Sequence, residues 1–198
     1  MPLIAFEGID RSGKETQAKL LKDWFGDKAE LVSFPRYNGP VGALIKANIR
    51  CHKTVQGAAY LQTLMVADRL DFVSGLSQDL SHFTIVDRFT MTGVAYGMAD
   101  GLPYDWCMDL HRPLPSLDLT FLVDIPAHIA AARRPAEDGY EANLMFQRQV
   151  AENYLNLALA LPNVYVLDGT ETPEAIHQEV LQVVTAYYPD AGRLLKSA

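Results

Sequence analysis

The chain has 198 residues, of which 49% are hydrophobic and 21% are charged, a balance typical of a folded domain rather than a disordered or fibrous chain. A net charge of −7 argues against a nucleic-acid polymer as partner, because binding to such a polymer needs a basic surface. No run approaches the length of about 18 apolar residues of a membrane span, and residues 1–8 do not resemble a secretion signal. We therefore expect a cytoplasmic protein with no membrane partner.

Short apolar runs alternate with helix-length amphipathic segments, which is the pattern of a parallel sheet built from βαβ units. The predicted strands are Leu3–Glu7, Glu30–Phe34, Thr84–Asp87, Leu119–Asp124 and Val164–Leu167. The predicted helices are Lys14–Phe25, Val41–Ile49, Ala58–Leu80, Thr90–Met98, Ala127–Arg134, Glu141–Leu161 and Pro173–Tyr188. Gly101–Pro115, which carries Gly and Pro at both ends, is predicted as turns. We expect one α/β domain over residues 1–198, with two reduced cysteines, Cys51 and Cys107, that form no metal site.

The first strand leads directly into Gly8-Ile-Asp-Arg-Ser-Gly13-Lys14, where the first helix begins. In this strand-to-helix context a GxxxxGK pattern predicts a loop that curls its amides around a phosphate. The helix dipole attracts the same anion, and Lys14 adds a mobile positive charge. The alternative is a glycine-rich turn followed by a solvent-exposed lysine.

Position 15 departs from this pattern, because it holds Glu15 where a Ser or Thr hydroxyl normally binds Mg²⁺. Thr16 follows one place late. A carboxylate is a hard oxygen ligand that could hold Mg²⁺, but it also adds negative charge beside a polyphosphate. Two interpretations are therefore open: Glu15 binds the metal, or the site has lost its usual metal ligand.

Several further segments occur in a fixed order along the chain. They are Phe6–Lys14 with Thr16-Gln17, Phe34-Pro35-Arg36, Val86–Tyr96, Asp105-Trp106-Cys107 and Leu114–Leu119. Together they resemble the thymidylate kinase family of P-loop nucleoside monophosphate kinases over essentially the whole chain. The resemblance implies a three-layer α/β/α fold with a five-stranded parallel sheet and a short lid at about residues 133–141.

The same resemblance implies transfer of the γ-phosphate of MgATP to a pyrimidine deoxynucleoside monophosphate, dTMP above all, by a homodimer with Mg²⁺ as cofactor. Glu15 and Met65 motivate two alternatives. One is a viral-type kinase for another or modified deoxynucleoside monophosphate. The other is a nucleotide-binding regulator with impaired catalysis. The long helices that begin near Ala58 and Glu141 could form the dimer, although core packing explains their apolar faces equally well.

The catalytic candidates are Arg11, Lys14 and Asp87. Arg11 lies within the phosphate loop and could stabilise the charge of the transferring group, unless it only pairs with Asp10. Asp87 ends an apolar strand, where it could organise Mg²⁺ or cap the next helix. The resemblance also implies that Asp10 binds the sugar of the acceptor. The residues expected to bind ATP are Gly8, Asp10, Arg11, Ser12, Gly13, Lys14, Glu15, Thr16 and the lid residue Arg134, and those expected to bind the metal are Glu15 and Asp87.

On the acceptor side, the resemblance places Arg36 and Arg88 on the monophosphate, which suits their planar guanidinium groups. It places Arg69 on the phosphate or the base, while Asp68 leaves an ordinary ion pair open for Arg69. Met65 stands where the family usually has Phe. The remaining residues that the resemblance places near the base, the sugar or the lid side are Thr92, Tyr96 and Tyr140, and Tyr96 could equally belong to the core.

Overall fold

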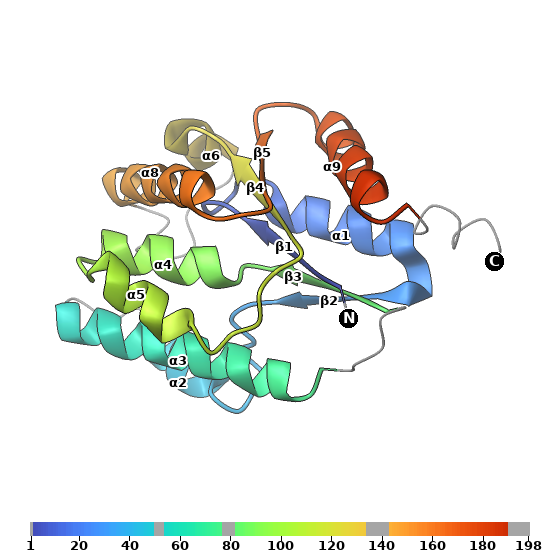
Figure 1. Ribbon diagram of the computed structural model, residues 1–198. Coiled ribbons are helices and arrows are strands. Elements are labelled where there is room, and N and C mark those ends of the chain that lie inside the picture. The colour runs from blue at the N-terminus through green and yellow to red at the C-terminus, as the bar shows by residue number, and fades with distance from the viewer. Residues whose placement is uncertain (1, 50–53, 77–81, 134–142, 190–198) are drawn as a thin grey trace.

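The computed structural model in Figure 1 describes residues 2–49, 54–76, 82–133 and 143–189. Five parallel strands form one sheet in the order β2-β3-β1-β4-β5. The strands are β1 Leu3–Glu7, β2 Ala29–Ser33, β3 Phe83–Asp87, β4 Leu119–Asp124 and β5 Val164–Asp168. The helices are α1 Lys14–Phe25, α2 Gly42–Asn48, α3 Val55–Ser74, α4 Thr90–Ala99, α5 Tyr104–His111, α6 Ala127–Arg133, α8 Leu144–Ala160 and α9 Pro173–Tyr187, with a 3-10 turn, η1, at Gly26–Lys28.

The central strand β1 is buried over its whole length, and its side chains alternate between two cores. Ile4 and Phe6 belong to a cluster with α1 and α9, whereas Leu3 and Ala5 face a second cluster that includes residues at the end of α3. Helices therefore cover both faces of the sheet, as Figure 1 shows. The predicted three-layer fold with a five-stranded parallel sheet is confirmed.

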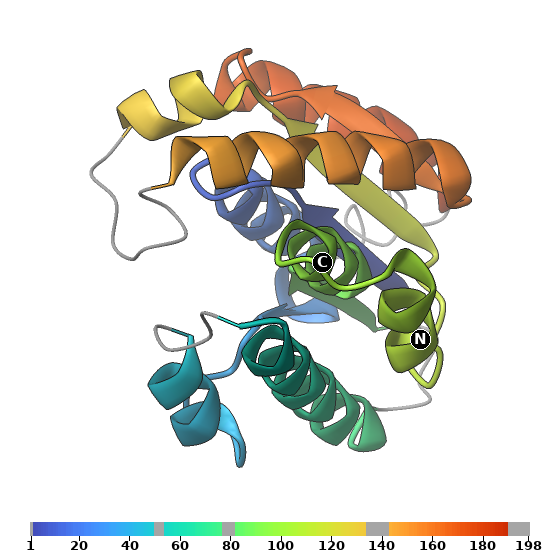
Figure 2. The same cartoon turned by 90° about the vertical axis from the view of Figure 1, so that its left-hand side faces the viewer.

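Helix α4 lies between α8 and α3 and also packs against α5 (Figure 2). Two glycines one turn apart, Gly93 and Gly97, let these neighbours approach its backbone. A Cβ atom at Gly93 would lie 2.0 Å from Nε2 of His111, and one at Gly97 would lie 2.9 Å from Sγ of Cys107. This glycine face of α4, formed by Gly93 and Gly97, is therefore filled by side chains of α5.

The main departure from the predicted elements is α5, which occupies part of the segment predicted as turns. Pro103 precedes the helix, and Cys107 and His111 are its buried positions, four residues apart. So short an apolar stripe between Gly and Pro residues gives a weak helical pattern. The η1 turn was also not predicted. Most other predicted boundaries differ from the observed ones by a few residues at most, although 77–81 and 134–142 lie outside the described residues.

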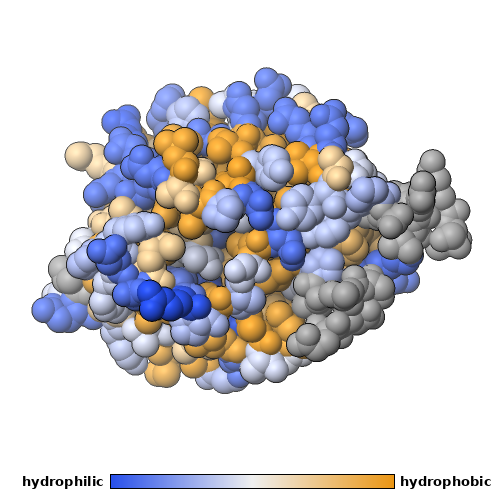
Figure 3. Space-filling model, viewed as in Figure 1, coloured by the Kyte–Doolittle hydropathy of each residue, from blue (hydrophilic) through white to orange (hydrophobic). Residues whose placement is uncertain are grey.

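The surface mixes polar and apolar side chains, and Figure 3 shows apolar ones gathered over the region of α8 and β5. Leu155 and Leu159, one turn apart on α8, are 39% and 89% exposed. On the edge strand β5, Tyr165 and Val166 are also exposed. Within the described ranges, no helix is both long enough and apolar enough to cross a membrane.

Replacement of Gly93 by alanine should destabilise the fold. The new methyl group would overlap the His111 ring, so we expect the free energy of unfolding to fall by about 1–3 kcal/mol. Gly75→Ala is the matched control, because there the nearest atom is 3.6 Å away. Denaturant unfolding of the three proteins measures both effects. Equal stabilities of the two variants would contradict the close packing described for α4.

Candidate functional site

The phosphate loop joins β1 to α1 and needs glycine at both of its ends. Gly8 and Gly13 have φ angles of 144° and 104°, and a Cβ atom at Gly8 would lie 2.6 Å from the carbonyl oxygen of Val123. Between them, Arg11 adopts a left-handed φ of 64°. The buried Lys14 side chain folds back over the loop, and its Nζ donates to the carbonyl oxygen of Ile9 at 3.2 Å. The sequence thus forms the curled loop that the motif predicts.

Burial strongly affects the charge of Lys14. Loss of solvation, together with the nearby positive charge of Arg88, lowers the pKa of Lys14 to about 8, although Asp87 and Asp10 act in the opposite direction. Part of the Lys14 population is consequently neutral at slightly alkaline pH. A bound polyphosphate would restore the positive charge.

Asp87 ends β3 beside the loop and is 7% exposed. Its Oδ1 atom is buried and has no hydrogen-bond partner among the described residues. Asp87 does not cap α4, because the N-cap residue of this helix is Phe89 and the amides of Phe89 and Thr92 donate to the carboxylate of Glu7 instead. The helix-cap alternative for Asp87 was therefore wrong, and the carboxylate is available to a ligand.

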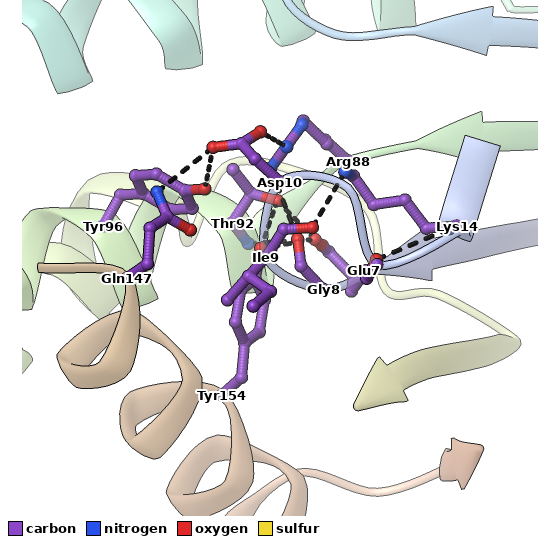
Figure 4. Close-up of polar contacts among 11 residues, drawn as sticks. Glu7, Gly8, Ile9, Asp10, Lys14, Arg88, Thr92, Tyr96, Gln147 and Tyr154 are labelled. Atoms are coloured by element: carbon purple, nitrogen blue, oxygen red, sulfur yellow. Dashed lines mark hydrogen bonds and ion pairs between the residues drawn. The ribbon is translucent and has the colours of Figure 1, made fainter. Parts of the chain in front are cut away.

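The start of α4 is instead held by Glu7, the last residue of β1, which has no exposed surface. Glu7 accepts hydrogen bonds from the Phe89 amide at 2.9 Å, the Thr92 amide at 3.1 Å and the Thr92 hydroxyl at 2.5 Å. The Tyr154 hydroxyl of α8 lies 2.7 Å from the Thr92 hydroxyl (Figure 4). Burial raises the pKa of Glu7, although its hydrogen bonds with Thr92 and Phe89 oppose this shift. We call these groups the Glu7 clamp.

A second polar cluster surrounds Asp10 in the loop. Its carboxylate pairs with Arg88 and accepts hydrogen bonds from the Tyr96 hydroxyl at 2.7 Å and the Gln147 amide at 3.2 Å (Figure 4). Burial would raise the pKa of Asp10, but Arg88 and Lys14 outweigh it and hold this pKa below its ordinary value. Asp10 therefore joins the phosphate loop to α4 and α8. It pairs with Arg88 and not with Arg11, whose Nη1 donates to the carbonyl oxygen of Ala131.

A cavity of about 110 Å³ lies next to this cluster. Arg69 is 1% exposed, and its Nε and Nη1 atoms have no hydrogen-bond partner among the described residues. Burial lowers the pKa of Arg69 to about 10, so the guanidinium remains charged at neutral pH. The side chains that line the cavity include the predicted acceptor residues Met65, Arg69, Arg88, Thr92 and Tyr96, together with Phe34, Gln62 and Gly93.

The other predicted acceptor arginine, Arg36, is engaged elsewhere. Its Nε lies 3.0 Å from Asp68, and its Nη2 lies 2.6 Å from Asp71. Asp68 is fully buried and also accepts a hydrogen bond from the Arg36 amide at 2.8 Å, which makes Arg36 its hydrogen-bonded partner. The direct ion pair considered between Asp68 and Arg69 is therefore not the observed arrangement, and Arg69 remains directed at the cavity.

A hollow lined by Arg11, Gly13, Lys14, Glu15, Thr16 and Arg133 lies on the outer side of the loop. Glu15 is exposed and forms an ion pair with Lys19 at 2.6 Å. Arg133, at the end of α6, donates to the carbonyl oxygens of Ser12 at 2.7 Å and Gly169 at 2.5 Å. Arg133 thus joins the phosphate loop to the loop after β5.

The predicted residues Arg134 and Tyr140 lie outside the described residues, as does most of the predicted lid. Sequence reasoning gave no role to Glu7, Gln147 or Tyr154, and it named Arg133 only as the start of the lid. The sequence position of Glu7 could have indicated a structural role, since a charged residue at the end of an apolar strand needs partners when it is buried. Gln147 and Tyr154 had no such signal, because each lies among both polar and apolar residues on α8, where nothing local marks it.

A family model described as Thymidylate kinase matches residues 6–180. The chain belongs to the thymidylate kinase family. A curated relative named "Thymidylate kinase" from Schizosaccharomyces pombe is 30% identical over 92% of this chain and 91% of its own length. A "Probable thymidylate kinase" from Thermococcus kodakarensis is 31% identical over 91% of this chain and 96% of its own length. The solved thymidylate kinase of Candida albicans has the same fold, with a TM-score of 0.82 and 24% identity over 93% of this chain and 91% of its own.

Membership of the thymidylate kinase family makes the chain a transferase that phosphorylates dTMP with ATP. These relatives favour neither the modified-nucleotide kinase nor the regulator considered from Glu15 and Met65. In the ranges that the structure describes, no three His, Cys, Asp or Glu side chains form a metal-binding group. The expected cytoplasmic location stays a prediction.

ATP binding should be accompanied by proton uptake at about pH 8.5, because the pKa of Lys14 near 8 rises when the ammonium meets the triphosphate. Calorimetric titration in buffers of different ionisation enthalpy measures this uptake. In Lys14→Arg, which keeps a positive charge that does not titrate, the uptake should disappear. Binding by the unaltered chain without proton uptake would contradict the buried, partly neutral amine.

Proposed function

We propose that the chain transfers the γ-phosphate of MgATP to dTMP across the end of β1, with the two nucleotides in separate hollows. One observation carries this proposal. The hollow beside Lys14 and the cavity beside Arg69 are both lined by buried cations, and Arg88 of the cavity wall pairs with Asp10 of the phosphate loop. Such an arrangement suits a reaction that depends on positioning and charge rather than on a covalent intermediate.

On the donor side, we assign the triphosphate to the loop amides from Gly8 to Lys14, the Ser12 and Thr16 region and the N-terminus of α1. Lys14 is already desolvated, so its ammonium interacts with phosphate oxygens through little water. Arg11 projects from a left-handed position of the loop and is the group proposed to stabilise charge on the transferring phosphate. Arg133 holds the loop through the Ser12 carbonyl.

The residues at the site fit Mg²⁺ bound with ATP. The buried Oδ1 of Asp87 has no hydrogen-bond partner in the part of the chain that the structure describes, and a carboxylate oxygen is the ligand that Mg²⁺ or its bound water prefers. When bound, Mg²⁺ neutralises charge on the phosphates. Glu15 lines the hollow beside Lys14 but engages Lys19, so we assign Asp87 the main role in holding the metal and Glu15 an auxiliary one.

On the acceptor side, we assign Arg88 to the monophosphate and Arg69 to the base end of the cavity. Arg88 lies at the loop, where Asp10 holds its pKa above the ordinary value even though burial opposes this shift. Met65 and Phe34 supply apolar walls for the base, and Tyr96 and Asp10 lie where the sugar would pass. We propose that Arg36 acts through the Phe34-Pro35 segment that it anchors, with its guanidinium 5.9 Å from the centre of the Phe34 ring.

Loss of Arg11 or Lys14 should abolish most turnover. Arg11→Ala and Lys14→Met each remove a cation from the transferring phosphate, so we expect kcat to fall at least ~100-fold. The KM for dTMP should change little, because neither side chain lines the acceptor cavity. A coupled assay of ADP release measures both constants, and Lys46→Met on the exposed face of α2 is the control. Variants that keep near-normal kcat would refute these assignments.

We further propose that two chains associate through α8. This helix exposes Leu155 and Leu159 on one face, which costs free energy in water unless another surface covers them. Size-exclusion chromatography with light scattering should give the mass of two chains. Leu159→Glu should shift the protein toward single chains, whereas Leu44→Glu on α2 should not. A single-chain mass for the unaltered protein would exclude the proposed dimer.

A further inference from the structure

Gln62 is a buried residue of α3 to which the proposed function assigns no role. It is 5% exposed and lines the acceptor cavity together with Arg69 and Gly93. Its Cγ lies 3.6 Å from where a Cβ of Gly97 would be, so its side chain extends along the glycine face of α4. Its Oε1 is buried without a hydrogen-bond partner among the described residues. A buried amide oxygen left in this state costs free energy unless a ligand or a neighbour satisfies it.

His111 lies behind Gly93 and is fixed in one neutral form. Its Nδ1 lies 2.8 Å from the carbonyl oxygen of Cys107, which can only accept, so Nδ1 carries the proton. Burial and the positive charge of Arg69 lower the pKa of His111 to about 4, and the ring is therefore uncharged at neutral pH. Nε2 then presents a lone pair, and no described residue donates to it.

Two hydrogen-bond acceptor atoms consequently lie near Gly93. A Cβ atom there would lie 2.0 Å from Nε2 of His111 and 3.3 Å from Oε1 of Gln62. A half turn of the Gln62 amide exchanges its oxygen and nitrogen without any movement of the backbone. The amide NH₂ would then face the lone pair of His111, and the carbonyl oxygen would face the cavity. With this single change, Nε2 of His111 would gain a hydrogen-bond donor, and the carbonyl oxygen of Gln62 could accept a hydrogen bond from a ligand in the cavity.

We infer that Gln62 reads the base edge of the acceptor through its carbonyl oxygen, and that His111 sets the direction of the Gln62 amide. The inference rests on the proposed assignment of this cavity to the acceptor. Gln62 offers an acceptor and Arg69 offers donors on the same wall. A uracil or thymine ring carries the complementary pair, a donating N3–H next to an accepting C4 carbonyl. Cytosine has both groups reversed, with a lone pair at N3 and an amino group at C4, so it would leave Gln62 and Arg69 unsatisfied.

The test compares kcat/KM for dTMP, dUMP and dCMP in the unaltered chain, in Gln62→Met and in Gln56→Met. Methionine keeps the length of Gln62 and removes its hydrogen bond, so we expect the preference for dTMP over dCMP to fall ~10–100-fold. The preference of dTMP over dUMP should not change, because both rings carry N3–H. Gln56 is exposed in the first turn of the same helix and serves as the matched control.

His111→Asn tests the positioning role. The asparagine NH₂ can still donate to the Cys107 carbonyl, but the group that faces Gln62 is gone. We expect a smaller loss of the dTMP over dCMP preference than in Gln62→Met. A purely structural role would lower activity with all three acceptors by the same factor and leave their ratios intact.

The outcomes separate this inference from the proposed function. If the unaltered chain does not phosphorylate dTMP, the proposed function fails first. If it prefers dTMP but Gln62→Met keeps the full preference over dCMP, the role of Gln62 is overturned and the proposed function stands. An unaltered chain that accepts dCMP as well as dTMP also overturns the role of Gln62, and this measurement does not depend on the folding of any variant.

Discussion

The Glu7 carboxylate is the interaction on which the site depends. It is fully buried at the end of the central strand and holds the amides of Phe89 and Thr92 in the first turn of α4. The residue after Glu7 opens the phosphate loop, and the residue before Phe89 is Arg88. One buried group therefore fixes the phosphate loop relative to Arg88. A carboxylate without solvent is costly, and the three hydrogen bonds that it accepts from Phe89 and Thr92 offset this cost.

The site is rich in buried charge before any substrate binds. Lys14, Arg69 and Arg88 are all desolvated, and their main acidic neighbours are Asp87, Glu7 and Asp10. Burial lowers the pKa of Lys14 and of Arg69, which means that their positive charges are incompletely compensated. Anionic nucleotides supply the missing compensation. Substrate binding and charge stabilisation at the transferring phosphate thus use the same preorganised groups.

Three helices meet at the glycine face of α4, and their packing connects stability with specificity. Gly93 leaves room for His111, and the amide of Gln62 approaches the same glycine. In the inference above, the close approach of α5 therefore sets the direction of the Gln62 amide at the wall of the acceptor cavity. A side chain at position 93 would remove this arrangement, because it would occupy the volume of the imidazole ring.

The sequence by itself determined the alternation of strands and helices and the phosphate loop at residues 8–14, because these depend on local periodicity and on a motif. Its resemblance to the thymidylate kinase family supplied most candidate residues of the acceptor cavity. Tertiary structure decided which charges meet. Asp10 pairs with Arg88, Asp68 pairs with Arg36, and the first turn of α4 is held by Glu7 rather than by Asp87. It also decided that α5 is a helix, that Gln62 lines the cavity and that His111 packs against Gly93. These pairings join residues 32 to 85 positions apart, or depend on the close approach of separate helices, and no local pattern encodes such contacts.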